Sequence, residues 1–184
     1  MPRPTTLRRS RTRSGEQCAV LMFHVILLNP QIPPNTGNII RLCANTGASL
    51  HLIHPLGFTL DEKSCRRAGL DYHALSDVHQ HDNLQQCLDA LQTPRLFAIT
   101  KFGNTRYDSV AYQPGDALLF GAETSGLPDA LHDSIDDDHK LALPMAGDNR
   151  SLNLSNAVAV VLYEAWRRCD FAGMVPLPAN PDLV

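Results

Sequence analysis

Four small polar side chains gather in the segment SLNLSN (residues 151–156), directly after a loop that contains Gly147. Helical spacing begins within this segment, and its apolar face comprises Leu154, Ala157, Val158, Val161, Leu162 and Ala165. The first turn of a helix has unpaired backbone N–H groups, which Ser and Asn side chains cap well. Two interpretations stay open here: capping alone, or a ligand site built at a helix N-terminus.

A second polar segment, GAETSGLP (residues 121–128), follows an apolar run. Its G-x-x-x-x-G spacing is that of a phosphate-binding P-loop, but Leu127 stands where a P-loop needs lysine. The chain also lacks the G-x-G-x-x-G dinucleotide fingerprint. We interpret the segment as a tight loop at the carboxyl end of a strand, where open α/β sheets bind ligands. A plain turn accounts for Gly121 and Gly126 but less well for Glu123.

Histidine pairs raise the question of a metal site. In a strand, His51 and His54 project to opposite faces, whereas His79 and His81 share one face. Neither pair has an acidic or thiol partner at a recognisable spacing, so we expect no catalytic metal. A Ser-His-Asp hydrolase is disfavoured because no G-x-S-x-G segment occurs.

The elements that must position these residues alternate between strand and helix. Short apolar runs predict buried strands at residues 23–28, 50–53, 95–100, 117–120 and 141–143. Capping residues and helical spacing predict helices at residues 35–46, 61–68, 83–91 and 154–168, with a further short helix after Pro128. This alternation predicts an α/β domain with a parallel sheet flanked by helices.

Composition limits the class of protein. With 184 residues, 43% of them hydrophobic, the chain can bury one core. No apolar run reaches the roughly 18 residues of a membrane span, so we expect no membrane partner. Five cysteines without a C-x-x-C pair argue against a disulfide framework or a zinc knuckle and fit a cytoplasmic protein.

Charge is distributed unevenly. The net charge is −3, but residues 1–21 hold five of the 16 basic residues and one of the 19 acids. The remainder therefore has 11 basic and 18 acidic residues, a net charge of −7. A nucleic acid must accordingly meet a local basic patch.

We expect residues 1–21 to be a disordered basic extension, residues 22–170 a single domain, and residues 171–184 a mobile tail. Three interpretations of the basic extension are open: a start-site artefact with the working start at Met22, an arm that touches RNA, or a transit peptide. We favour the first.

Three segments follow predicted strands. The first contains Asn35, Arg41, Asn45 and Gly47; the second is LFGAETSGL (residues 119–127). The third runs from LPM (residues 143–145) into SLNLSNA (residues 151–157). Taken together, these segments resemble the three motifs of the SPOUT-class RNA ribose 2'-O-methyltransferases.

Three further segments are PQIPPNTGNIIRLCANTG (residues 30–47), RRAGLDYH (residues 66–73) and YEAWR (residues 163–167). They resemble the corresponding segments of the minimal bacterial tRNA wobble-nucleotide 2'-O-methyltransferases, and the resemblance extends from about Phe23 to Arg168. Two positions depart from the pattern: Asn29 stands where an acid is common, and Ala122 where proline is common. Neither change removes a reactive group.

The resemblance implies a SPOUT fold with a trefoil knot in the C-terminal half, which general topology rules would have rejected. It implies a knotted loop cluster that holds S-adenosyl-L-methionine, with cofactor contacts from Ile99, Thr100, Gly121, Glu123, Gly126, Leu141, Leu143, Met145, Ser151 and Leu152. It also implies a homodimer that binds a tRNA anticodon stem-loop across both subunits. The basic surface would combine Arg41, Lys63, Arg66, Arg67, Arg150 and Arg167.

The implied reaction moves a methyl group to the ribose 2'-hydroxyl of the wobble nucleotide (position 34), a cytidine or modified uridine, in leucine tRNAs. Arg41 resembles the catalytic arginine of the family, yet a guanidinium with a pKa above ~12 is a poor base. We expect Arg41 to hold the adjacent phosphate and stabilise the developing alkoxide. Proton acceptance by Arg41 stays open. We expect Asn35, Ser151 and Asn153 to orient the ribose and Arg41.

One alternative belongs to another class: an RNA-binding or assembly factor that keeps the fold without catalysing. The complete set of expected site residues argues against it.

Overall fold

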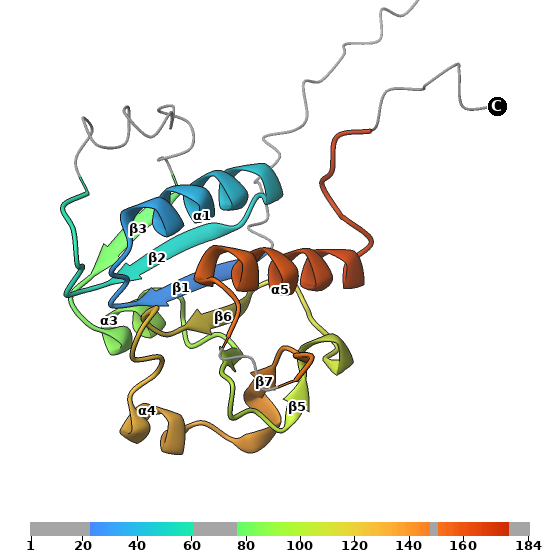
Figure 1. The fold of residues 1–184 in the computed structure, drawn as a ribbon. Helices are drawn as coiled ribbons and strands as arrows, with labels where there is room; N and C mark the ends of the chain where they lie inside the picture. Colours follow the sequence, from blue (N-terminus) through green and yellow to red (C-terminus); the bar gives the residue numbers. More distant parts are fainter. Residues whose placement is uncertain (1–22, 61–76, 148–150, 177–184) are drawn as a thin grey trace, which may run out of the picture.

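The computed structural model describes residues 23–60, 77–147 and 151–176. Within them, seven strands form one parallel sheet in the order β3-β2-β1-β6-β4-β7-β5 (Figure 1). The strands are β1 (Phe23–Leu28), β2 (Ser49–Ile53), β3 (Val78–His81), β4 (Leu96–Ile99), β5 (Thr105–Arg106), β6 (Asp116–Phe120) and β7 (Lys140–Ala142). The helices are α1 (Pro33–Thr46), α3 (Leu84–Ala90), α4 (Asp129–Ser134) and α5 (Leu154–Arg168), with short 3-10 turns at Tyr107–Ser109 and Asp137–His139.

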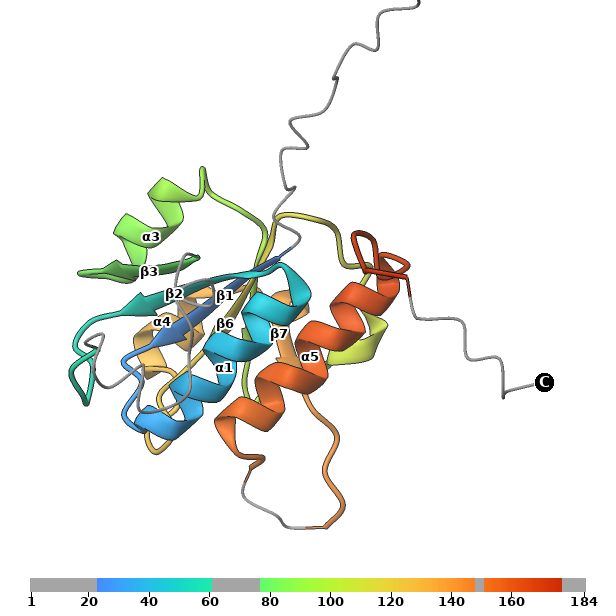
Figure 2. The same ribbon diagram turned by 90° about the horizontal axis from the view of Figure 1, so that it is seen from above.

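Helices cover both faces of the sheet. Helices α1 and α5 lie side by side on one face, and α3 lies on the opposite face (Figure 2). Strand side chains alternate between faces, so Val25 and Leu27 join the core under α1 and α5, while Ile26 and Leu28 face α3 and α4. Buried parallel strands need apolar residues on both sides, which explains the continuous apolar runs.

Helix α1 has clear local start and stop signals. Pro33 and Pro34 occupy its first positions, where the fixed φ of proline suits a helix. Gly47 ends it in the left-handed conformation with φ +70°. The predicted end before Gly47 is confirmed, and Ile39, Ile40 and Cys43 are buried.

Helix α5 buries all six apolar residues predicted for its inner face. Asn153 caps it, because its side-chain oxygen accepts a hydrogen bond from the Ser155 N–H at 2.9 Å. Burying each large aliphatic side chain contributes roughly 1.5–3 kcal/mol. The packing of this face against α1 and the sheet therefore fixes where the N-terminus of α5 lies.

The α/β architecture with a parallel sheet is as predicted, and the five apolar strands are confirmed within one or two residues at each end. Two strands were missed. The sequence VHQH of β3 is too polar to read as a buried strand, and β5 has only two residues. The helix expected at residues 61–68 lies outside the described residues. No helix of the described part is long and apolar enough to cross a bilayer.

Candidate active site

Four neighbouring parallel strands, β1, β6, β4 and β7, end at the same edge of the sheet. Their carboxyl ends lead into the loops that contain the three motif segments. The Thr100 N–H donates to the Leu141 carbonyl at 2.9 Å, which joins the loop after β4 to β7. Gly103 lies against this strand so closely that a Cβ there would be 2.6 Å from the Lys140 carbonyl oxygen. This edge is where open α/β sheets bind ligands.

The loop after β6 closes on itself. Ala122 and Gly126 exchange two backbone hydrogen bonds. The distance from the Ala122 nitrogen to the Gly126 oxygen is 3.2 Å, and that from the Gly126 nitrogen to the Ala122 oxygen is 2.9 Å. A Cβ on Gly121 would lie 2.2 Å from the Gly126 carbonyl carbon, well inside the contact limit. Gly126 itself has φ +71°, which side-chain-bearing residues rarely adopt. Both glycines are therefore required by the shape of the loop.

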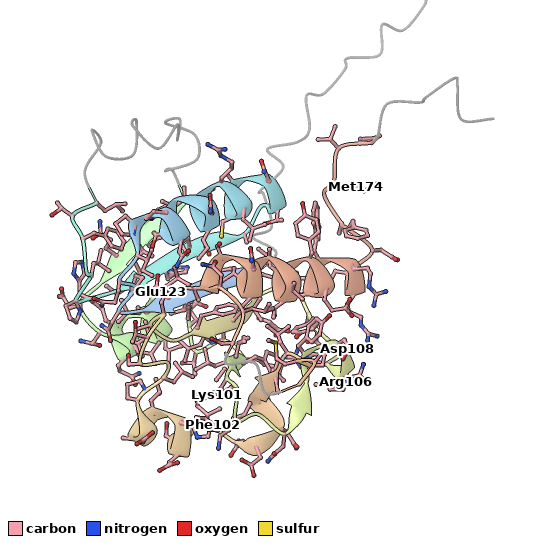
Figure 3. The ribbon with its side chains drawn as sticks, viewed as in Figure 1. Lys101, Phe102, Arg106, Asp108, Glu123 and Met174 are labelled. Carbon is pink, nitrogen blue, oxygen red and sulfur yellow. The ribbon has the colours of Figure 1, made fainter. Side chains whose placement is uncertain are left out.

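Glu123 extends from this loop to the start of α1. Its carboxylate accepts hydrogen bonds from the backbone N–H groups of Gln31 (2.8 Å) and Ile32 (3.1 Å) and from the Asn35 side chain (3.0 Å). Burial tends to raise the pKa of Glu123, but these hydrogen bonds together outweigh it and leave the pKa below its usual value. The group is therefore an ionised carboxylate at neutral pH that fixes the entry to α1. Figure 3 shows Glu123 at the end of the molecule where α1 and α5 begin.

Asn35 connects this carboxylate to the third segment. While its amide nitrogen donates to Glu123, its amide oxygen accepts from the Asn153 side chain at 2.9 Å. The Asn153 oxygen in turn accepts from the Ser155 N–H and hydroxyl, at 2.9 and 2.7 Å. A continuous hydrogen-bonded chain thus joins all three motif segments, although 88 and 118 residues separate Asn35 from its two partners.

The remaining expected catalytic residues lie on exposed surface. Arg41 is exposed on α1, the helix that carries buried Asn35. Ser151 is exposed two residues before the cap of α5. Asn153 serves both as that cap and as the partner of Asn35, so it does more than cap the helix; a ligand site at this N-terminus stays a prediction.

The expected cofactor residues group around the loop cluster. Ile99, Thr100 and Leu143 are half-buried at strand ends, while Met145 and Leu152 are exposed by 38% and 39%. Leu141 is fully buried and its carbonyl is bonded to Thr100, so it lies beneath the surface. Exposed apolar side chains beside closely packed loop backbone fit a nucleoside cofactor, whose base needs an apolar surface and a few polar groups.

The expected RNA-binding residues are only partly placed. Lys63, Arg66, Arg67 and Arg150 lie outside the described residues. Arg167 forms a two-pronged ion pair with Glu164, both distances 2.8 Å. It follows Asn153 by 14 positions on α5, so the helix rise places it roughly 20 Å from the loop cluster of its own chain.

One exposed pair in the loop after β4 was not singled out from the sequence. Phe102 is 65% exposed, and the Lys101 ammonium lies 4.8 Å from the centre of its ring (Figure 3). The signal was an aromatic residue beside a lysine directly after a predicted strand. An exposed ring with a cation over it offers surface for stacking a base.

Residues 22–163, which include the sheet and its loop cluster, match the SpoU rRNA Methylase family, and the chain belongs to that family. The tRNA (cytidine(34)-2'-O)-methyltransferase of Methylovorus glucosotrophus (strain SIP3-4) is 54% identical over 154 residues, which are 84% of this chain and 100% of the relative. The enzyme of the same name from Escherichia coli (strain K12) is 52% identical over 154 residues, covering 84% and 98%.

Solved structures agree with the fold. One that concerns the 2-OH methylation of C/U34 on tRNA has a TM-score of 0.75 at 41% identity and covers 82% of this chain and 98% of that chain. The SpoU methyltransferase AviRb from Streptomyces viridochromogenes, in complex with AdoMet, has a TM-score of 0.69 at 26% identity, covering 85% and 63%. Both superpose on most of the described residues.

Proposed function

We propose that this protein transfers a methyl group from S-adenosyl-L-methionine to the ribose 2'-hydroxyl of nucleotide 34 in the anticodon stem-loop of tRNA. The observation that carries the proposal is the hydrogen-bonded chain Glu123–Asn35–Asn153, which joins the three motif segments at one edge of the sheet. Support for the substrate comes from relatives that act on cytidine 34 and match over nearly their full length. Cytidine is therefore the first nucleotide 34 to test, followed by modified uridine. Leucine tRNAs are the tRNAs in which we expect these nucleotides to be methylated.

The cofactor would be held by the loops after β4, β6 and β7. When bound, S-adenosyl-L-methionine supplies an electrophilic methyl group on a sulfonium. Leu143, Met145 and Leu152 offer apolar surface for its base, and the tight Gly121–Gly126 loop allows backbone to approach closely. The family includes a protein solved with AdoMet bound, which supports this choice.

The roles of the polar residues follow from their contacts. The side-chain amides of Asn35 and Asn153 are hydrogen-bonded to each other, and they also bond Glu123 and Ser155, respectively. We therefore assign both as positioning residues. Arg41 and Ser151 are exposed and can meet RNA. Arg41 would hold the phosphate next to the ribose and stabilise charge on the 2'-oxygen, for which its planar set of donors is suited. A hydroxyl positioned for attack can gain several kcal/mol over one that diffuses.

A test in cells separates this proposal from a non-catalytic RNA-binding factor. Ribose methylation is mapped across total tRNA from cells with and without the gene. We expect loss of methylation at position 34 of a small set of tRNAs when the gene is removed, and its return with the intact gene. An unchanged methylation map would favour the binding factor.

Cofactor binding gives a second, simpler expectation. A ligand at ~100 times its Kd stabilises a fold by about 2.7 kcal/mol, which for a domain of this size corresponds to a rise in Tm of about 5–10 °C. We expect S-adenosyl-L-methionine, or its demethylated product, to raise the melting temperature by this amount in differential scanning calorimetry. An unmoved melting temperature at saturating cofactor would argue strongly against an enzyme.

We infer a homodimer that packs through the outer face of α5. Val160 and Tyr163 lie one turn apart on this face and are 40% and 45% exposed, and the Tyr163 ring contacts Trp166 at 5.7 Å. Aromatic residues of this kind are enriched at subunit interfaces. A dimer would also bring the Arg167 of one subunit within reach of RNA held by the other.

Analytical ultracentrifugation tests the dimer. The chain should sediment as a dimer at micromolar concentration, and Val160→Asp should shift it towards monomer because a carboxylate would be buried. Val175→Asp is the matched control, since Val175 is 84% exposed beyond the end of α5. Sedimentation of the unmodified chain as a monomer would refute the interface.

We also propose that the C-terminal half forms the trefoil knot implied by the family resemblance. The chain order supports it: β7 pairs with β4 beyond β6, and α5 then returns to pack against α1. An experimental structure traced continuously from β6 to α5 tests the threading.

The free thiols of Cys43, Cys87 and Cys169 support a reducing cytoplasm as the place of action, which cell fractionation tests.

A further inference from the structure

A cluster of imidazole and thiol groups lies away from the loop cluster, on the face of the sheet that α3 covers. The register of β2 and β3 places His51 opposite His79 and Ile53 opposite His81. Because strand side chains alternate, these residues share one face. Cys87 of α3 is fully buried on the same face, beside Ile53 in the same core cluster. Figure 2 shows α3 next to β3, the edge strand.

Three of these residues bring ligand atoms together. One ligand atom each of His51, His81 and Cys87 lies within 4.8 Å of the other two. His51 Nδ1 and His81 Nε2 are 3.0 Å apart. Zinc bonds of about 2.0–2.1 Å to nitrogen and about 2.3 Å to sulfur, at tetrahedral angles, put neighbouring ligand atoms roughly 3.3–3.6 Å apart. Side-chain adjustments of an ångström or so convert the observed arrangement into a coordination site.

The orientation of His51 is already set by groups behind it. Its Nε2 lies 2.9 Å from the Ser49 hydroxyl, which is also 2.6 Å from His24 Nδ1. With Nε2 engaged by Ser49, Nδ1 is directed at His81. Metal-ligating histidines nearly always use their second nitrogen in this way, which fixes the ring and its tautomer.

We propose that His51, His81 and Cys87 form a site for a borderline-soft divalent metal ion, with Zn²⁺ as the preferred occupant. Two nitrogens and one sulfur are a ligand set that zinc takes readily and that Mg²⁺ and Ca²⁺ disfavour. His81 is partly exposed, which leaves a fourth position for water. The ion would tie α3 and the outermost strand β3 to β2, and so stabilise this side of the sheet. It has no part in the proposed methyl transfer, and its test is independent of that function.

Calorimetric titration of Zn²⁺ into tag-free protein, freed of metals and kept reduced, tests the site. We expect one zinc ion per chain. Ser49→Ala should weaken binding by about 10- to 100-fold, the usual effect of removing a group that supports a ligand. Cys87→Ser and His81→Ala should each weaken binding more than Ser49→Ala does. Cys169→Ser and His54→Ala, which change a thiol and an imidazole outside the cluster, should leave the affinity unchanged.

Substitution with Co²⁺ provides a readout that folding defects do not imitate. A bound thiolate gives cobalt a charge-transfer band in the near ultraviolet, which we expect in the intact chain and in Cys169→Ser but not in Cys87→Ser. His81→Ala keeps the thiol and changes a partly exposed residue. It therefore still tests the site if the Cys87 variant fails to fold. Absence of zinc binding would overturn the proposal, and so would equal affinity in the intact chain and His81→Ala, or a cobalt complex lacking the thiolate band. In those cases His81, His51, Ser49 and His24 form a hydrogen-bonded chain and bind no metal ion.

Discussion

Replacing Arg41 with alanine should reduce the single-turnover rate of methylation by about 100- to 1,000-fold while leaving cofactor affinity nearly unchanged. The loss of a charge contact made in the transition state typically costs roughly 2.7–4 kcal/mol. Arg41 is exposed on α1, whereas the expected cofactor residues lie in β4 and β7 or in the segments after β4, β6 and β7. Folding should survive, because exposed side chains outside the core usually contribute under about 1 kcal/mol.

Two further variants sharpen this result. Arg41→Lys should restore little activity, because a point charge cannot replace a planar fork of donors. Arg106→Ala removes an exposed arginine of β5 that pairs with Asp108, and it serves as the control that keeps full activity. Full activity in Arg41→Ala would remove Arg41 from the mechanism. Lost cofactor binding with intact folding would instead place Arg41 in the cofactor site.

Gly121→Ala should have the largest effect on cofactor binding. Its Cβ would lie 2.2 Å from the Gly126 carbonyl carbon and 2.5 Å from the Leu127 nitrogen, both backbone atoms that cannot rotate away. The loop must open, at a cost of about 1–3 kcal/mol. If the cofactor needs the closed loop, its affinity falls by about 5- to 150-fold in calorimetric titration.

Ser125→Ala is the matched control for this substitution. Ser125 is exposed in the same loop and already has a Cβ, so its replacement should leave affinity unchanged. Cofactor affinity that stays the same in Gly121→Ala would mean that the loop after β6 takes no part in holding the cofactor.

Local sequence signals were sufficient for most of the fold. The apolar runs of β1 and β6 and the inner face of α5 follow from period and composition, because both faces of these strands and one face of the helix are buried in the core clusters on either side of the sheet. Strand β3 was missed because an edge strand next to a polar cluster does not need apolar residues. The order of strands could not be read from the sequence, since it depends on pairings between distant segments.

The residues of the site could likewise be predicted from the sequence, but the contacts between them could not. Asn35, Glu123 and Asn153 were each singled out from the sequence, but their mutual contacts span 88 and 118 residues and no spacing rule reaches so far. Glu123 was expected at the cofactor, and the structure adds that both its oxygens bond the start of α1. The histidines form two close pairs in the sequence, 51/54 and 79/81, whereas the structure brings one member of each pair, His51 and His81, together with Cys87.

The most direct test of the account is single-turnover methylation of an anticodon stem-loop by the purified protein. Two RNAs are compared that differ only in the sugar of cytidine 34, ribose in one and 2'-deoxyribose in the other. We predict transfer of a labelled methyl group to the first and none to the second, with the label mapped to nucleotide 34. Equal labelling of both RNAs, or labelling at another nucleotide, would contradict the proposed ribose 2'-O-methylation at this position.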